Sequence, residues 1–154
     1  MLETPQITQT TNRNTAAIHL TIPRDEIQNV MGPGLQELMA TIEAQAITPT
    51  GPWFTHHLKM SPGIFDFEIC VPVSAPVTAT GRVKPGHWPA MRVARTVYCG
   101  PYEGLGEAWG EFLEWVETNG HSTAPDLYEC YLTGPESGPD PAKWRTELSK
   151  PLAN

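Results

Sequence analysis

Residues 64–73, IFDFEICVPV, decide the fold class of this 154-residue chain. Apolar side chains alternate there with Asp66, Glu68 and Cys70, which is the period-two pattern of a strand with one buried face. Because the apolar positions must lie under helices, we expect the three polar side chains on the open face of a sheet. The segment therefore predicts an antiparallel sheet that is covered on one side.

A weaker copy of this strand ends the chain. Thr146–Leu152 (TELSKPL) matches Phe67–Val73 (FEICVPV), so that Glu68 corresponds to Glu147. Self-similarity of this kind indicates an internal repeat. In the last strand Leu148 is the apolar member, so Glu147 is expected on the open face as well.

The regions between these strands complete two βαββ halves, about residues 15–75 and 88–152, within one domain spanning 15–152. Gly32-Pro33 and Gly100-Pro101 are expected to mark the starts of the two helices. Residues 1–14 are expected to be a frayed tail, and Val77–Pro89 a linker. The predicted fold is α+β, a curved antiparallel sheet with both helices on one face and a central ligand cleft. We expect strands at 15–23, 53–60, 64–73, 91–99, 127–133 and 143–152, and helices at 35–46 and 105–117.

Composition excludes several classes of protein. The net charge is −7, and no basic cluster could neutralise several phosphates, so direct binding of nucleic acid is not expected. The three cysteines form no CxxC pair, so neither a disulfide framework nor a zinc site is expected, and no cofactor is implied. The sequence contains no apolar run long enough to span a membrane and no secretory signal, so we expect a cytoplasmic protein, by default a monomer.

A glycine-rich stretch, Gly100–Gly106 (GPYEGLG), could be mistaken for a phosphate-binding loop. It lacks the lysine and the spacing of such loops, and the acidic helix after it would repel an anion. The stretch is therefore interpreted as the start of a helix.

Glu129 is the strongest candidate for a functional side chain. Its neighbours Tyr128, Cys130 and Tyr131 indicate a buried strand, and a buried carboxylate needs a partner, a raised pKa or a cationic ligand. If Tyr128 and Cys130 pack under the helices, Glu129 lies on the cleft face beside Tyr131. Near the pseudo-twofold axis that would relate the two halves, the expected carboxylates are then Glu68, Glu129 and Glu147. For each of them, the alternative interpretation is an acid on a solvated strand face.

Aromatic and histidine side chains provide further candidates for the cleft. Trp53 and Trp88 lie at strand or loop edges, where an aromatic ring can line a pocket, although ordinary core packing is the alternative. His56 and His57 are adjacent on a strand and must point to opposite faces, so they cannot ligate one metal together. His56 is expected in the cleft as a hydrogen-bonding residue.

Three segments carry a resemblance to a known family. They are RVARTVYCGPYEGLGEAWGEFLEWVETNG (92–120), APDLYECYLTGPE (124–136) and DPAKWRTELSKPL (140–152). Together with GPWF (51–54) and FDFEICVPV (65–73), they resemble the GyrI-like small-molecule-binding family, over about residues 15–152. That family includes the effector-binding domains of AraC- and MerR-type multidrug regulators, and stand-alone proteins.

The resemblance implies a tandem βαββ, SHS2-like fold whose central cleft takes lipophilic compounds, often cationic or planar and aromatic. It also implies that Glu129 is the pocket glutamate and Glu147 a further acid. Tyr131 and Trp53 are expected as pocket walls from their strand parity. His56-His57 stands where many relatives carry an Arg-Tyr pair, which is a departure from the family pattern.

Three functions follow as hypotheses. The first is a stand-alone module that binds lipophilic drugs or toxins, since only polar residues precede the first strand and no helix-turn-helix is seen. The second is a hydrolase that opens strained cyclopropane rings of DNA-alkylating natural products, with Glu129 activating water, as some relatives do. The third is a protein-interaction module whose contact surface is the acidic helix Glu103–Glu117.

Overall fold

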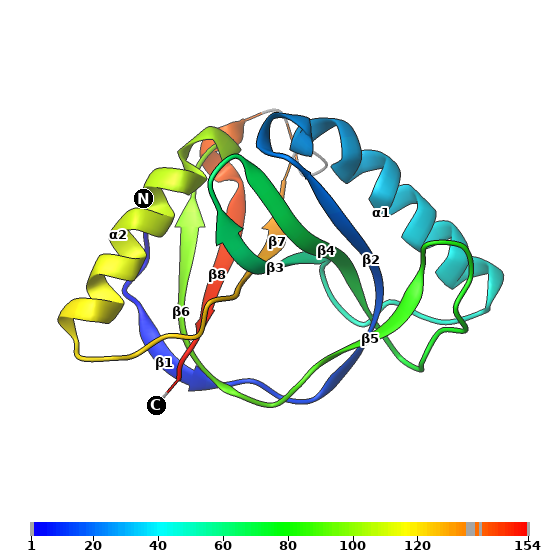
Figure 1. Cartoon of the computed structure of the whole chain (residues 1–154), viewed down its shortest axis with the longest axis horizontal. Coiled ribbons are helices and arrows are strands. Elements are labelled where there is room, and N and C mark those ends of the chain that lie inside the picture. The colour runs from blue at the N-terminus through cyan, green and yellow to red at the C-terminus, as the bar shows by residue number, and fades with distance from the viewer. Residues whose placement is uncertain (1, 135–137, 139, 154) are drawn as a thin grey trace. The chain divides into compact units, whose positions relative to one another are not determined.

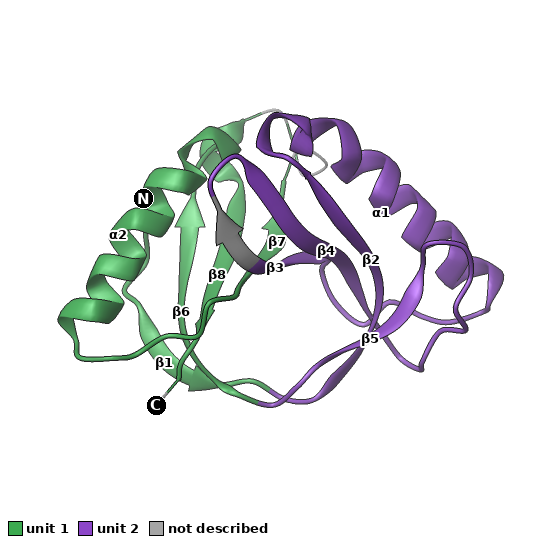
Figure 2. Ribbon diagram, viewed as in Figure 1, with its two compact units in different colours: residues 1–10, 91–154 green, residues 11–90 purple. Residues whose placement is uncertain are grey.

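The computed structural model describes residues 2–134, 138 and 140–153, with the backbone alone for 59–61. The chain divides into two compact units, which Figure 2 shows in different colours. Unit 1 comprises Met1–Thr10 and Met91–Asn154, and unit 2 comprises Thr11–Ala90. Among the residues described, each unit contains four antiparallel strands and one long helix. The predicted α+β class is therefore confirmed.

Unit 2 carries the strand that decides the fold class. Its strands are ordered β3-β4-β2-β5, and the helix α1 packs on β2 and β4 (Figure 1). β4 has the bounds that the sequence predicted. The elements are β2 (Arg13–Pro23), the 3₁₀ turn η1 (Arg24–Glu26), α1 (Ile27–Ala44), β3 (Phe54–Ser61), β4 (Ile64–Val73) and β5 (Lys84–Trp88).

The alternation of β4 separates its two faces as expected. Phe67 and Ile69 are fully buried in a core that includes Leu38 and Ile42 of α1. Glu68, which lies between them in sequence, points to the other face, where it meets His56. The period-two pattern alone was sufficient to orient this strand.

Unit 1 repeats the plan with its strands ordered β1-β6-β8-β7 (Figure 1). The helix α2 buries Trp109, Phe112 and Val116 in a core with Ala94 and Leu148. This is the apolar stripe that its sequence predicts. The elements are β1 (Gln6–Gln9), β6 (Arg92–Cys99), the 3₁₀ turn η2 (Tyr102–Gly104), α2 (Leu105–Thr118), β7 (Leu127–Thr133), the 3₁₀ turn η4 (Pro141–Lys143) and β8 (Arg145–Pro151).

The predicted internal repeat is visible in the strand registers. In each unit a row of three neighbouring side chains crosses the central strands on the side that faces the helix. The row in unit 2 is Thr55, Ile69 and Ile18, and the row in unit 1 is Glu129, Leu148 and Thr96. Glu129 therefore takes the place of a threonine in the other half.

Two edge strands lie where the sequence predicted no regular structure. β1 falls within residues 1–14, the expected frayed tail, and pairs with β6. β5 falls within Val77–Pro89, the expected linker, and pairs with β2. Edge strands are held largely by backbone hydrogen bonds to one neighbour, so their side chains need not alternate, and a search for alternation misses them.

The first helix also begins earlier than predicted. α1 starts at Ile27 rather than Leu35 and continues through Gly32 and Pro33, which were interpreted as its boundary. Gly34 fits here because a Cβ atom at this position would lie 2.6 Å from Cδ1 of the buried Ile69. The expected correspondence with Gly100-Pro101 is thus wrong, since that pair precedes η2.

Among the described residues, no helix combines the length and the apolar character needed to cross a bilayer.

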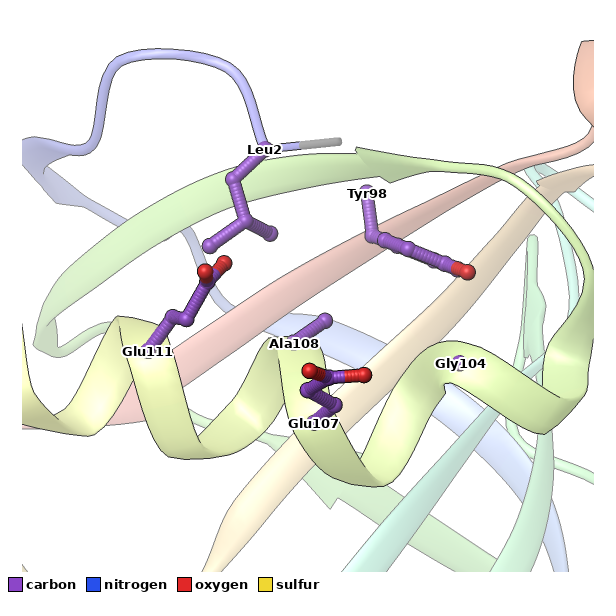
Figure 3. A pocket seen from close by; sticks show the side chains of 6 residues that line it. All are labelled: Leu2, Tyr98, Gly104, Glu107, Ala108 and Glu111. Carbon is purple, nitrogen blue, oxygen red and sulfur yellow. The ribbon is translucent and has the colours of Figure 1, made fainter.

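The glycines of the GPYEGLG segment make room for one tyrosine ring. A Cβ atom on Gly104 would collide with the hydroxyl group of Tyr98 and lie 3.1 Å from its Cζ atom (Figure 3). Gly100 has a φ of 149° and faces the same hydroxyl group. The segment starts a helix, as predicted, and its glycines serve packing.

We expect Gly104→Ala to destabilise the protein by about 1–3 kcal/mol, because the buried Tyr98 ring must shift to admit the methyl group. Gly106→Ala is the matched control, since a Cβ atom there meets nothing within 4 Å. Because alanine has a higher helix propensity than glycine, Gly106→Ala should raise the free energy of unfolding by about 0.5–1 kcal/mol. Urea unfolding of both variants measures the difference, and equal stabilities would refute this account of Gly104.

Candidate functional site

Glu129 lies on β7 with both carboxylate oxygens hydrogen-bonded. The indole Nε1 of Trp109 donates to Oε2 over 2.6 Å, and the hydroxyl group of Tyr131 donates to Oε1 over 2.8 Å. Trp109 comes from α2, and Tyr131 lies two residues further along β7. The two donors are 9% and 8% exposed, whereas Glu129 is partly buried. One carboxylate is thereby fixed by two neutral aromatic donors.

The face on which Glu129 lies corrects the sequence analysis. Glu129 is directly opposite Leu148 of β8, which packs under α2, so Glu129 faces the helix. Tyr128 and Cys130, which were expected under the helix, point to the other face. They are nevertheless only 3% and 4% exposed. Because β7 is buried on both faces, the pattern of its apolar residues does not reveal which of its two alternating sets of side chains faces α2.

Burial raises the pKa of the Glu129 carboxyl group, and the hydrogen bonds from Trp109 and Tyr131 oppose that shift in part. Glu129 takes part in none of the ion pairs that join described residues. Within the part of the chain that the structure describes, its carboxylate is thus balanced by the hydrogen-bond donors Trp109 and Tyr131 and by no ion pair. A site of this kind favours either a proton or a positively charged ligand.

Further aromatic rings continue outward from Tyr131. Tyr102 of η2 meets Tyr131 edge to face, with ring centroids 5.9 Å apart, and Trp144 lies 5.0 Å from Tyr102. Both outer rings are half-buried. The sequence analysis named neither Tyr102 nor Trp109 as a residue of the site. The GPY segment contains the only local signal for Tyr102, and no spacing rule joins Trp109 to Glu129.

Glu147 does not join Glu129. It lies opposite Cys130 in the register, and therefore on the other face of β8, where its Oε1 is 3.5 Å from Nε of Arg95. Arg95 also donates to the hydroxyl group of Ser149 over 3.0 Å. Within unit 1, the expected grouping of Glu129 with Glu147 is thus wrong, because the two residues have opposite parity.

The remaining candidates belong to unit 2. His56 and Glu68 meet across β3 and β4, with Nδ1 and Oε1 3.3 Å apart, and His57 points to the opposite face, as predicted. Trp53 is half-buried against the core under α1. Trp88 is buried against Phe54, with ring centroids 4.8 Å apart. Both tryptophans thus have the core packing that was the alternative interpretation.

The described surface of unit 1 includes two hollows that Glu129 does not line. One, of about 270 Å³, lies between α2, β6 and the N-terminal segment (Figure 3), and the other, of about 300 Å³, lies along β1 and β6. Glu107 and Glu111 line the first hollow and belong to the exposed acidic face of α2. A protein partner at this face stays a prediction.

Within residues 2–134, 138 and 140–153, no three His, Cys, Asp or Glu side chains are placed to hold a metal ion.

The fold and this acidic, aromatic site define a class of small-molecule-binding domain. The family model of the GyrI-like small molecule binding domain matches residues 3–153. The chain therefore belongs to the GyrI-like family, as its sequence motifs indicated. No curated protein matches it.

Solved structures share the fold. The EcmrR C-terminal domain is 22% identical, with a TM-score of 0.87 and 98% of each chain covered. In the EcmrR–DNA complex the identity is 24% and the TM-score 0.85, but the match covers 97% of this chain and only 57% of that longer one. SAV2435, bound to tetraphenylphosphonium, is 13% identical with a TM-score of 0.71, covering 99% and 95% of the chains. A hydrolase encoded by lin2189 from Listeria innocua is 16% identical with a TM-score of 0.68, covering 97% and 91%.

Proposed function

We propose that this GyrI-like protein binds lipophilic cations and that the Glu129 carboxylate supplies their counter-charge. The observation that carries the proposal is the environment of this carboxylate, which is partly buried and held by two neutral donors. An ionised carboxylate in such surroundings is destabilised relative to water, and the attraction of a bound cation would offset that penalty. The site thus gains more from a cation than an exposed glutamate would.

The aromatic rings around Glu129 supply the second part of the recognition. The outer rings of Tyr102 and Trp144 are half-buried, so part of each ring surface is open to a ligand. Each ring face attracts a cation by about 0.5–2 kcal/mol, depending on how far it is desolvated. The ligand of SAV2435, tetraphenylphosphonium, has both properties that this site favours, positive charge and aromatic surface.

The hydrogen bonds of Glu129 set the requirement for binding. A cation must approach the carboxylate while Trp109 and Tyr131 hold its two oxygens at 2.6 and 2.8 Å. A diffuse cation such as a phosphonium needs no hydrogen bond of its own, so it does not compete with the two donors for the oxygen lone pairs. The preferred ligands are therefore lipophilic onium ions rather than primary amines.

Replacing Glu129 tests the proposal directly. We expect Glu129→Gln to weaken tetraphenylphosphonium binding at least about tenfold, because the charge is lost while the shape is kept. Binding of triphenylphosphine oxide, a neutral compound of similar surface, should change less than about twofold. Titration calorimetry at neutral pH measures both affinities.

Glu147→Gln is the matched control, since it removes an acid from the other face of the same sheet and should leave both affinities unchanged. Equal loss of cation binding in both variants would mean that net charge, and not the Glu129 site, attracts the ligand. No saturable binding by the wild-type protein would overturn the proposal.

Hydrolysis is the second candidate, and the raised pKa of Glu129 favours it. A carboxylate of raised pKa, hydrogen-bonded to the Tyr131 hydroxyl group, is suited to take a proton from water. On a strained cyclopropane, the water oxygen would bond to one ring carbon as the ring C–C bond breaks, and the proton would pass to the carbon released. Mass spectrometry would detect the addition of one water, and Glu129→Gln should abolish it while a neutral substrate still binds.

A further inference from the structure

The strand β1 (Gln6–Gln9) forms an outer edge of unit 1. It is the last strand in the order of that unit, and among the described strands it pairs with β6 alone (Figure 1). Hydrogen bonds fix the chain at both of its ends. Before β1, the amide of Glu3 donates to the carbonyl oxygen of Val97 over 2.9 Å. After it, the amide of Thr10 donates to that of Met91 over 2.8 Å, so β1 is a formed edge and not a loose end of the chain.

The backbone groups of β1 alternate between β6 and the outer edge. Because the amide of Thr10 points to β6, the N–H and C=O groups of Gln9 and Ile7 point away from it. Arg92 of β6 lies opposite Gln9 and accepts a hydrogen bond from Leu152 on its other side, which agrees with this alternation. Among the described residues, none hydrogen-bonds to the outward groups of Ile7 or Gln9. The edge thus presents donors and acceptors in the plane of the sheet.

β1 lacks the features that usually prevent an edge strand from pairing. Such strands commonly carry a lysine, a proline or a bulge. The edge strand of unit 2, β5, fits this rule with Lys84 and Pro85. β1 (QITQ) contains neither residue type, and its register with β6 is continuous. Residues 4–12 (TPQITQTTN) carry no charge, although the chain has a net charge of −7, so two copies can meet here without bringing like charges into the strand contact.

We propose that this edge pairs with the same edge of a second copy of the chain, antiparallel and about a twofold axis at Thr8. In this register Ile7 of each copy exchanges its backbone hydrogen bonds with Gln9 of the other, so every outward group of the strand is used. Thr8 faces Thr8 across the axis, and threonine pairs are favourable at such positions. Because the same patch serves both copies, the contact closes at a dimer. The inferred dimer departs from the monomer that was expected by default.

The concentration dependence of the mass is the first test. A strand of four residues buries little surface, so a weak dimer is expected. Sedimentation equilibrium of the full chain at about 10 μM to 1 mM should show an average mass that rises from 17.0 kDa toward twice that value. A mass that stays at 17.0 kDa up to about 1 mM would overturn the proposal.

Opposite charges at Thr8 test the twofold register. Thr8 lines the open hollow along β1 and β6, so a longer side chain has room there. Thr8→Lys should weaken the dimer at least about tenfold, because like charges that lie directly opposite across a strand pair repel each other. Thr8→Glu should weaken it for the same reason. An equimolar mixture of the two variants should associate at about the wild-type strength, which would also show that both variants are folded.

Controls separate the β1 contact from general effects of charge. Thr8→Lys lowers the net negative charge of the chain, which by itself favours association, so the expected weakening is local. His87→Lys adds the same charge at an exposed position of β5 and should leave the dimer unchanged. Glu129→Gln should leave it unchanged as well, so this proposal and the proposed function can fail separately.

A proline at Gln9 tests the backbone contact itself. Gln9→Pro removes an outward N–H group and keeps the bonds of β1 to β6, since an edge strand tolerates proline where the N–H group faces solvent. It should weaken the dimer about tenfold or more. A dimer that persists in both Thr8→Lys and Gln9→Pro is joined by another surface, which would overturn the proposal. A mixture of Thr8→Lys and Thr8→Glu that stays monomeric would overturn the twofold register.

Discussion

Acidification from neutral pH to about pH 4.5 is expected to lower the free energy of unfolding by about 2–3 kcal/mol through His57 alone. The His57 ring is 5% exposed and stacked on Phe67, with ring centroids 5.2 Å apart and planes 14° apart. Burial, together with the nearby charges of His56 and Arg24, lowers the pKa of His57 from 6.5 to about 4. Folding therefore requires the neutral imidazole.

The direction of the pH effect follows from proton counting. In the unfolded chain His57 takes up a proton near its ordinary pKa of 6.5, but in the folded chain it does so only near 4. Between these values the unfolded state binds more protons, so stability falls as the pH falls. The contribution is complete above the unfolded pKa and lost progressively in acid.

His57→Phe is expected to remove most of this sensitivity, because a phenyl ring fills the same aromatic position and never ionises. Urea unfolding at both pH values gives the difference, and the variant should lose about 2–3 kcal/mol less than the wild type on acidification. His87→Gln, at an exposed position, is the control for a histidine that folding does not bury. Identical pH profiles for the wild type and His57→Phe would contradict the assignment.

The sequence predicted the elements whose two faces differ. β4 and α2 were placed nearly to the residue because each buries one face and exposes the other, which leaves a clear period in the side chains. The opposite orientations of His56 and His57 followed from the same rule. The repeat between Phe67–Val73 and Thr146–Leu152 then extended the prediction to the second unit.

The sequence failed where both faces of an element are alike. β7 (LYECYLT) is buried on both sides, so parity could not decide whether Glu129 or Cys130 faces α2. The hydrogen bond from Trp109 joins residues 20 positions apart in different elements, and only the packing of α2 on the sheet creates it. Glu129 was thus identified correctly as a partly buried acid, but its partners depend on tertiary structure.

The two titrating groups act on the protein in opposite ways. His57 makes the folded state prefer high pH, whereas Glu129, with its pKa raised by burial, makes it prefer low pH. Ionisation of Glu129 therefore costs stability, and the contribution of this group to stability declines as the pH rises through its raised pKa. Among the described residues Glu129 thus weakens the fold without forming an ion pair, which supports the ligand-binding role proposed for it.

Affinity for tetraphenylphosphonium is expected to fall about tenfold per pH unit once the pH drops below the raised pKa of Glu129. The proton and the cation compete for one carboxylate, and the cation carries a permanent charge, so the whole pH dependence belongs to the protein. The loss should begin at a higher pH than the ordinary value of 4.5 for glutamate. Titration calorimetry over a series of pH values measures it, and each cation bound below that pKa should release a proton to the buffer.

The His57→Phe background reduces acid unfolding in this measurement, since it removes one buried group whose protonation destabilises the protein over the same range. In that background Glu129→Gln should bind the cation weakly and with a flat pH profile. Triphenylphosphine oxide should show no pH dependence in either protein. A wild-type affinity that stays constant down to the ordinary pKa of glutamate would mean that the Glu129 carboxylate, whose pKa burial raises, is not the counter-charge.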